Sequence, residues 1–214
     1  MVEIIIRNNR YFLRGENIGI RCEIDCIQRL ESYNNPHQFV ATDCELYNLF
    51  SQDNEENIEN GIRLLNRAYH LQRRPVFNPL TFAPILITHL DEIRDTQEAN
   101  LGTLETICAN FNAFRNNLRN NLLPEVSLSK LLHFINPTSF WILDSRVNFI
   151  LQIWGYGGSY RGFGNFLRDI LNDPNFNSFR EFVFEKDVEL VNNHHIENYQ
   201  PYLLKVLDKI IWFH

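Results

Sequence analysis

Three features are scarce in this chain of 214 residues: cysteine, net positive charge and long apolar runs. The four cysteines, at positions 22, 26, 44 and 108, form no CxxC pair and have no ligand-rich neighbourhood. We therefore interpret them as reduced core residues of a cytoplasmic protein, and we expect no metal and no cofactor. The formal net charge of -6 excludes a global basic field for binding phosphates, although a local basic groove stays compatible with it.

Apolar runs long enough for a membrane helix are missing. The best candidate, residues 82–90, is interrupted by Pro84 and His89. The apolar start of the chain is too short for a signal sequence and contains Glu3. Because a membrane helix needs roughly 20 apolar residues, we expect a soluble protein that is neither secreted nor bound to a membrane.

Instead, apolar residues recur at a spacing of three and four, which is the period of an amphipathic helix. The run that begins near Ile18 continues in this way until Asn34, Asn35 and Pro36 stop it. The pattern predicts an all-α fold of about nine helices. Besides the helices of a hairpin that begins at Ser127, we expect helices at 18–33, 42–50, 57–72, 81–94, 97–122, 161–172, 178–192 and 199–212.

The sequence pattern at the start of the chain fits two structures. Residues 2–14 alternate loosely between apolar and polar around Asn8 and Asn9, which is compatible with a short hairpin or with an irregular arm. Further along, residues 73–79 contain two prolines and little periodicity. We predict a single helical domain over residues 1–214. Its lobes, if it has two around a cleft, would span about 1–74 and 80–214, joined by this proline-rich connection.

The most informative stretch lies between Ser127 and Val147. Its first part has apolar residues on one helical face and ends at Asn136-Pro137, which predicts a helix at 127–136. A short apolar segment, 140–143, follows. Asp144 then occupies the N-cap position of a second helix, whose buried residues would be Val147, Ile150 and Leu151.

This hairpin would bring Lys130, in the first helix, close to Asp144, at the start of the second. The dipole of a helix stabilises a negative charge at its N-terminus, and an apolar setting favours a lysine that can act as a nucleophile. Two plainer interpretations stand beside this one. Lys130 could extend from an amphipathic helix to solvent, and Asp144 could act only as an N-cap.

Residues 129–147 read S-K-L-L-H-F-x-x-P-x-x-F-x-x-x-D-S-R-V. This pattern resembles a motif of uncharacterised bacterial proteins that are distantly related to the helix-hairpin-helix base-excision DNA glycosylases. The resemblance implies a helical glycosylase-like fold, with Lys130 as the lysine of lyase-competent members and Asp144 as the catalytic aspartate. It covers about 20 residues. It does not extend to the Gly-x-Gly turn that holds a DNA phosphate in the family, because residues 124–129 contain no glycine.

The resemblance implies an N-glycosylase or abasic-site lyase that acts on or recognises a nucleobase in nucleic acid. Lys130 would attack the sugar C1′ to form a Schiff base, and Asp144 would stabilise the cationic sugar or activate the attacking group. We expect the substrate to be contacted by Trp141, Ser145, Arg146, Tyr156, Tyr160 and Arg161. The alternatives are a noncatalytic protein-interaction module on the same scaffold, with a protein partner, and an enzyme that processes free nucleosides.

Three other patterns carry weaker chemistry. Ser127-x-x-Lys130 fits a serine acylase, but the S-D-N and K-T-G companions are missing. His194, His195 and Glu197 resemble metal ligands without a further ligand at useful spacing. The loop at 154–166 interleaves aromatic residues with glycines, which favours either base stacking or a connector whose aromatic residues pack on the core. We interpret His133 as a hydrogen-bonded core residue.

Overall fold

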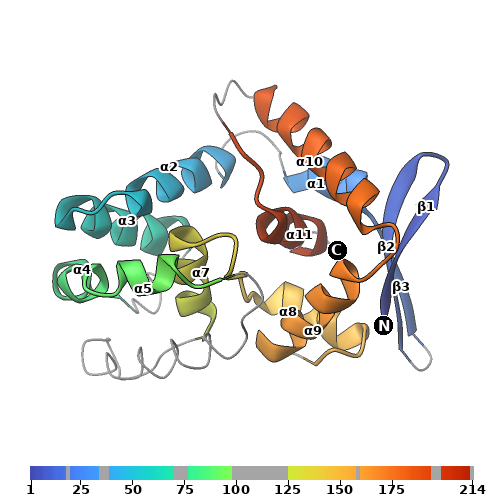
Figure 1. Cartoon of the computed structure of the whole chain (residues 1–214), viewed down its shortest axis with the longest axis horizontal. Coiled ribbons are helices and arrows are strands. Elements are labelled where there is room, and N and C mark those ends of the chain that lie inside the picture. The colour runs from blue at the N-terminus through green and yellow to red at the C-terminus, as the bar shows by residue number, and fades with distance from the viewer. Residues whose placement is uncertain are drawn as a thin grey trace. The chain divides into compact units, whose positions relative to one another are not determined.

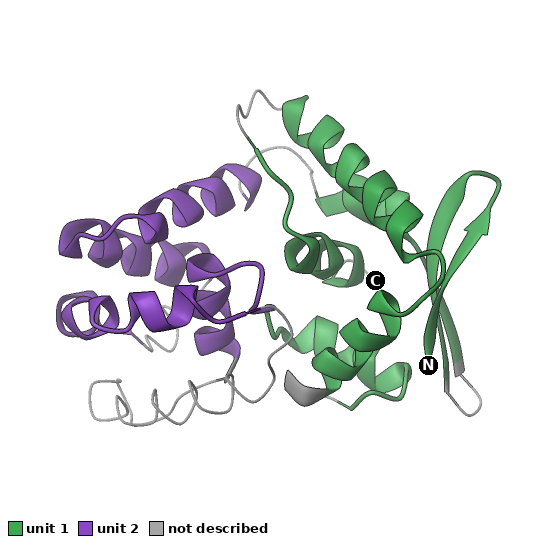
Figure 2. Cartoon of the chain, viewed as in Figure 1, with its two compact units in different colours: residues 1–36, 142–214 green, residues 37–141 purple. Residues whose placement is uncertain are grey.

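The computed structural model describes residues 1–17, 20–33, 39–69, 77–97, 125–157, 160–193 and 199–212. The chain divides into two compact units (Figure 2). Unit 1 combines Met1–Pro36 with Ile142–His214, and unit 2 is His37–Trp141. These boundaries differ from the lobes suggested by the proline-rich connection at 73–79, which belongs to unit 2 and is described only from Phe77 onward.

Unit 1 contains a three-stranded antiparallel sheet and five described helices (Figure 1). The strands, in the order β1-β2-β3, are β1 Val2–Arg7, β2 Arg10–Asn17 and β3 Ile20–Asp25. The helices are α1 Cys26–Tyr33, α8 Ser145–Ile153, α9 Tyr160–Leu171, α10 Phe176–Asn192 and α11 Leu203–Trp212. Helix α11 packs against α1, α8 and α10, and its residues from Leu204 to Ile211 are all buried.

The N-terminal residues form a hairpin, which is one of the two predicted alternatives. Asn8 and Asn9 connect β1 to β2 with φ values of 51° and 58°, a backbone conformation that asparagine tolerates well in two-residue hairpin turns. Side chains cover the other edge of β1. The Tyr156 hydroxyl accepts the Val2 N–H at 2.7 Å, and the Asp173 carboxylate accepts the Ile4 N–H at 2.8 Å.

The expectation of a purely all-α protein is wrong in this region. The helix predicted at 18–33 is two elements, strand β3 and helix α1. Cys22 and Ile24 are buried while Arg21 is exposed, so the side chains alternate with the period of a strand up to Asp25. The described residues form ten helices besides the sheet, which leaves the protein mostly helical.

Gly15 fixes the position of helix α8 on the sheet. A Cβ atom at Gly15 would lie 1.8 Å from Cδ1 of Trp154, the residue that ends α8. Only glycine leaves room for the buried indole at this point of β2. The C-terminal end of α8 is therefore held directly against the strand.

Unit 2 has five described helices: α2 Phe39–Ser51, α3 Glu55–Ala68, α4 Pro79–Ile87, α5 Leu90–Arg94 and α7 Glu125–Ile135. Asn54 and Asn78 cap α3 and α4, because their side chains accept backbone N–H groups of the first turn. Helix α2 packs against α3 and α7, α3 against α4, and α5 against α7. The buried core residues include Phe50, Ile58, Ile62, Leu65, Phe82, Leu86 and Leu131.

Several predicted boundaries in unit 2 need correction. Helix α2 begins three residues before Thr42, and Asp43 is a buried helical residue instead of part of a cap. The helix predicted at 81–94 is two helices, separated at Thr88 and His89. The helix predicted at 97–122 lies outside the described residues, as does Cys108. None of the described helices is both long enough and apolar enough to cross a membrane.

Candidate functional site

The two helices predicted at the ends of the segment from Ser127 to Val147 both form, as α7 and α8. Helix α7 ends at Ile135, directly before Asn136 and Pro137, and Asp144 caps α8. The boundary between the compact units falls after Trp141. Lys130 therefore belongs to unit 2 and Asp144 to unit 1.

The turn after α7 is held by its own polar side chains. The Asn136 side-chain amide donates to the carbonyl oxygens of Ile93, Arg94 and Thr96, at 3.0, 3.1 and 3.1 Å. The Ser139 hydroxyl donates to the Thr96 carbonyl at 2.6 Å. These bonds reach carbonyl groups in the last turn of α5 and that of Thr96, which follows the helix. The turn is thus fixed on α5.

His133 is a hydrogen-bonded core residue, as predicted. Its side chain is fully buried, with Nδ1 2.6 Å from the Phe140 carbonyl oxygen and Nε2 2.8 Å from the Tyr47 hydroxyl. A carbonyl oxygen can only accept, so Nδ1 carries the hydrogen. In the neutral imidazole, Nε2 then accepts a hydrogen bond from Tyr47. His133 therefore ties α2 and the segment after α7 to each other.

Lys130 is buried in unit 2, with 5% of its surface exposed. Its Nζ lies 5.1 Å from the centroid of the Tyr69 ring, a cation-π distance. The Tyr69 hydroxyl in turn donates to Oδ1 of the buried Asp43 at 2.6 Å. A lysine that extends to solvent does not fit this burial. Lys130 lies instead inside unit 2, over the ring of Tyr69.

Asp144 occupies the N-cap of α8 as predicted. Its backbone is extended, with φ -122° and ψ 156°, and its Oδ1 accepts the Arg146 N–H at 3.0 Å. The residue is partly exposed, whereas Val147, Ile150 and Leu151 of the same helix are buried. The side chain thus lies at the surface end of a helix whose body is fixed in the core of unit 1.

The face of α8 that follows Asp144 is exposed. Ser145 and Arg146 are both exposed, and the Arg146 guanidinium lies 4.5 Å from the centroid of the Trp212 ring on α11. Phe149, one turn further on, has 60% of its surface exposed. The sequence interpretation missed Phe149. The signal was available, because Phe149 falls outside the spacing of Val147, Ile150 and Leu151.

Two of the predicted substrate-binding residues are buried or hydrogen-bonded within the chain, and their contact with a substrate stays a prediction. Trp141 is 2% exposed. The Tyr156 hydroxyl donates to the Asp169 carboxylate and accepts the Val2 N–H, which fastens β1 to α9. Burial, followed by the hydrogen bond to Asp169, raises the pKa of Tyr156 above its usual value.

The glycine-rich loop forms only in part. Gly155 and Gly157 have φ values of 84° and 76°, but helix α9 already begins at Tyr160. A Cβ atom at Gly162 would lie 2.4 Å from the Gly157 carbonyl oxygen, so glycine permits a close approach of the two backbones. The side chains of Tyr160 and Arg161, the other predicted contacts, lie outside the described part of the chain.

The sequence interpretation also missed a cluster of buried charges in unit 1. Lys209 donates to both carboxylate oxygens of Asp187, at 2.8 and 3.1 Å, and lies 3.0 Å from the Tyr199 hydroxyl. Tyr199 donates to Asp187 at 2.6 Å. Lys205 pairs with Asp208 at 3.4 Å. The Asp187–Lys209 contact joins α10 to α11, whereas Lys205 and Asp208 both belong to α11, and we interpret all of these contacts as structural.

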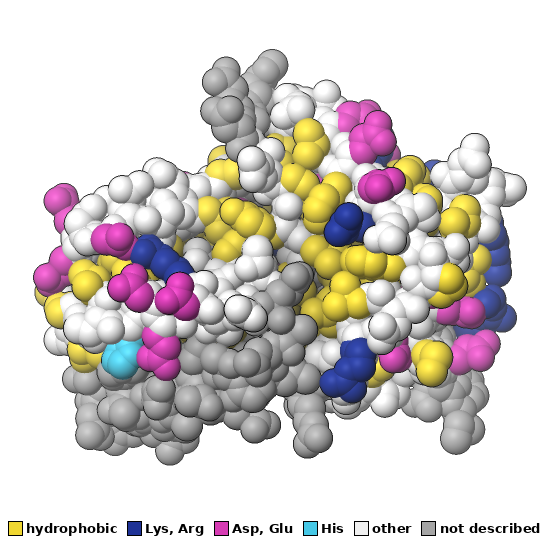
Figure 3. Space-filling model, viewed as in Figure 1, with side chains coloured by type: hydrophobic (Ala, Val, Ile, Leu, Met, Phe, Trp, Pro, Cys, Tyr) yellow, Lys and Arg dark blue, Asp and Glu magenta, His cyan; other side chains and the backbone are white. Residues whose placement is uncertain are grey.

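The described residues contain no group of three or more His, Cys, Asp or Glu placed to hold a metal ion. His194, His195 and Glu197 lie outside those residues. Acidic and basic side chains are interspersed over the described part of the face shown in Figure 3. No protein-family model, no curated protein and no solved structure matches this chain.

Proposed function

We propose that this protein acts on or recognises a nucleobase in nucleic acid, as its resemblance to the helix-hairpin-helix glycosylases implies, with Asp144 as the catalytic carboxylate. The observation that supports the proposal is the position of Asp144. It follows a buried apolar segment, opens a helix with a buried body, and stands partly exposed next to Ser145 and Arg146.

The proposed reaction is hydrolysis of the N-glycosidic bond. As the bond breaks, its electron pair leaves with the base and positive charge develops on the sugar, where the Asp144 carboxylate stabilises it. Water then adds to C1′ and loses a proton to the carboxylate, while the base takes up a proton. Arg146 would bind a phosphate, and the exposed Phe149 ring would offer a surface for a base.

Lys130 is the proposed group for a lyase step, in which its amine attacks C1′ and forms a Schiff base. The resemblance supports this step, whereas the side chain of Lys130 is buried. The same burial disfavours contact with a sugar, so we propose hydrolysis through Asp144 as the main reaction. Borohydride trapping on abasic DNA separates the two, because only the lyase route leaves a covalent adduct that Lys130→Met abolishes.

The direct test compares the wild-type chain with Asp144→Asn on oligonucleotides that carry uracil, hypoxanthine, 8-oxoguanine or an alkylated adenine. Asparagine caps a helix about as well as aspartate, so this change removes the charge and keeps the fold. Loss of a group of this kind lowers the rate by about 100-fold to 10,000-fold. Equal base release by Asp144→Asn and wild type, or no release from any substrate by wild type, would contradict the proposal.

The net charge of -6 favours two other functions. One is a noncatalytic module with a protein partner, and the other is an enzyme that acts on free nucleosides, which carry no phosphate. Nucleic-acid binding weakens steeply with salt because phosphate contacts release counterions. A salt-independent association with a protein would favour the module. Release of free base from nucleosides, but not from oligonucleotides, would favour the nucleoside enzyme.

A further inference from the structure

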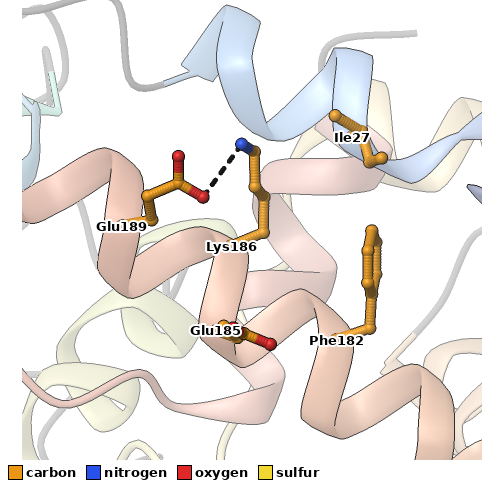
Figure 4. A pocket seen from close by; sticks show the side chains of 5 residues that line it. All are labelled: Ile27, Phe182, Glu185, Lys186 and Glu189. Atoms are coloured by element: carbon orange, nitrogen blue, oxygen red, sulfur yellow. Dashed lines mark hydrogen bonds and ion pairs between the residues drawn. The ribbon is translucent and has the colours of Figure 1, made fainter.

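A hollow of about 270 Å³ lies between α1 and α10 in unit 1 (Figure 4). Pockets for drug-sized ligands measure about 300–1,000 Å³, so this one fits a single side chain better than a larger molecule. Its lining residues are Ile27, Phe182, Glu185, Lys186 and Glu189. None of them takes part in the function proposed for α8.

The hollow has one apolar side. In Figure 4 the side chains of Ile27, from α1, and Phe182, from α10, point toward one another. Both residues are partly buried. The Phe182 ring is held from another side by Tyr11 of β2, with ring centroids 4.6 Å apart. The hollow therefore presents a fixed aromatic ring next to an aliphatic side chain.

The remaining side is acidic. Lys186 donates to Glu189 at 3.0 Å, so that carboxylate is already paired. Glu185 is exposed, and within the described part of the chain it has no ion pair and no hydrogen bond. The Glu185 carboxylate, beside the apolar side of the hollow, is thus not neutralised. This combination suits a cation with an apolar stem and repels a phosphate.

We propose that this hollow receives an arginine side chain of a protein partner. The aliphatic stem lies against Ile27, and the guanidinium pairs with Glu185 while it faces the Phe182 ring. Arginine fits better than lysine because its planar guanidinium binds a carboxylate through two hydrogen bonds and stacks on aromatic rings. This inference does not depend on the function proposed for Asp144.

The test uses the full chain, labelled with ¹³C in its isoleucine methyl groups, and the blocked peptide acetyl-Gly-Ser-Arg-Ser-Gly-amide. We expect the Ile27 methyl resonances to shift with this peptide, and to shift far less with a peptide that carries uncharged citrulline in place of arginine. Glu185→Gln should weaken binding about fivefold, the upper range for an exposed ion pair.

Glu181→Gln is the matched control, because Glu181 is exposed on the same helix one turn earlier and does not line the hollow. It should change the affinity by less than about twofold. No shift at Ile27 would overturn the proposal. A loss of affinity in Glu181→Gln as large as in Glu185→Gln would also overturn it, because general attraction to an acidic surface would then explain the binding.

Discussion

Breaking the buried ion pair between Asp187 and Lys209 should strongly destabilise unit 1, and the variant Asp187→Asn tests this. The side chain of Asp187 is 0% exposed and that of Lys209 is 1% exposed, so water does not screen the pair. Asparagine keeps the shape of the side chain and removes its charge. The Lys209 ammonium is then left buried without its carboxylate, although Tyr199 stays within 3.0 Å of Nζ.

Removal of one partner from a buried, hydrogen-bonded charge pair costs about 3–5 kcal/mol. With an m-value near 3 kcal/mol per molar urea, the unfolding midpoint should fall by about 1–1.7 M. Circular dichroism and tryptophan fluorescence during urea unfolding measure this shift. A loss of less than about 1 kcal/mol would refute the reasoning, because it would mean that solvent reaches the pair.

Two further variants test whether the buried, unpaired charge causes the loss of stability in Asp187→Asn. Glu189→Gln breaks an ion pair on the same helix, but that pair is exposed, with 59% of the Glu189 side chain accessible, so we expect a loss below about 1 kcal/mol. The double variant Asp187→Leu with Lys209→Met removes both charges together. It should recover most of the stability lost in Asp187→Asn, because an apolar pair leaves no buried charge unbalanced.

Three shorter predictions concern other parts of the fold. Gly15→Ala should destabilise the protein by about 1–3 kcal/mol, since the new Cβ meets Trp154; unchanged urea unfolding would contradict this. Asn54→Ala should cost about 1 kcal/mol and Asn54→Asp almost nothing, because only alanine loses the cap of α3; equal costs would exclude the capping explanation. The pKa of Tyr156 is raised in the folded state by burial and by Asp169, so its contribution to stability is complete below about pH 10 and is lost as the pH rises through the folded value. Between pH 9 and 11, wild type should therefore lose more stability than Tyr156→Phe, and identical losses would argue against the raised pKa.

Local signals predicted the ends of helices well wherever a single residue determines them. Asp144 and the pair Asn136-Pro137 are such residues, and α8 and α7 begin and end beside them. The strand β3 was missed for a physical reason. The apolar residues from Ile20 to Ile27 satisfy the period of a helix, while Cys22 and Ile24 also satisfy the period of a strand. The paired strand β2 decides between the two, and such pairing is not visible in the local pattern.

The candidate site was predictable only in part. The N-cap at Asp144 follows from local spacing, but the role of Tyr156 depends on Val2, which lies 154 residues away in the chain. A tyrosine in a glycine-rich stretch gives no local sign of such a partner. The ion pair of Asp187 with Lys209 likewise joins residues that are distant in the chain, so no local pattern predicts it. The spacing of apolar residues predicts a helix here, but it does not show that other helices cover all of its sides. It therefore does not predict that Lys205, Asp208 and Lys209 are buried.

Helix α8 links these observations to the proposed chemistry. At its C-terminal end, Trp154 packs directly against Gly15 of the sheet. Near its N-terminal end, Arg146 lies over the ring of Trp212, on the helix that carries the buried lysines. These contacts hold the helix in one position within unit 1, as packing does for any helix of a core. The chemical role proposed for Asp144 would use the same rigidity, because small displacements of a catalytic group cost large factors in rate. The comparison of Asp144→Asn with wild type therefore decides between a carboxylate that acts on a substrate and one that only caps its helix.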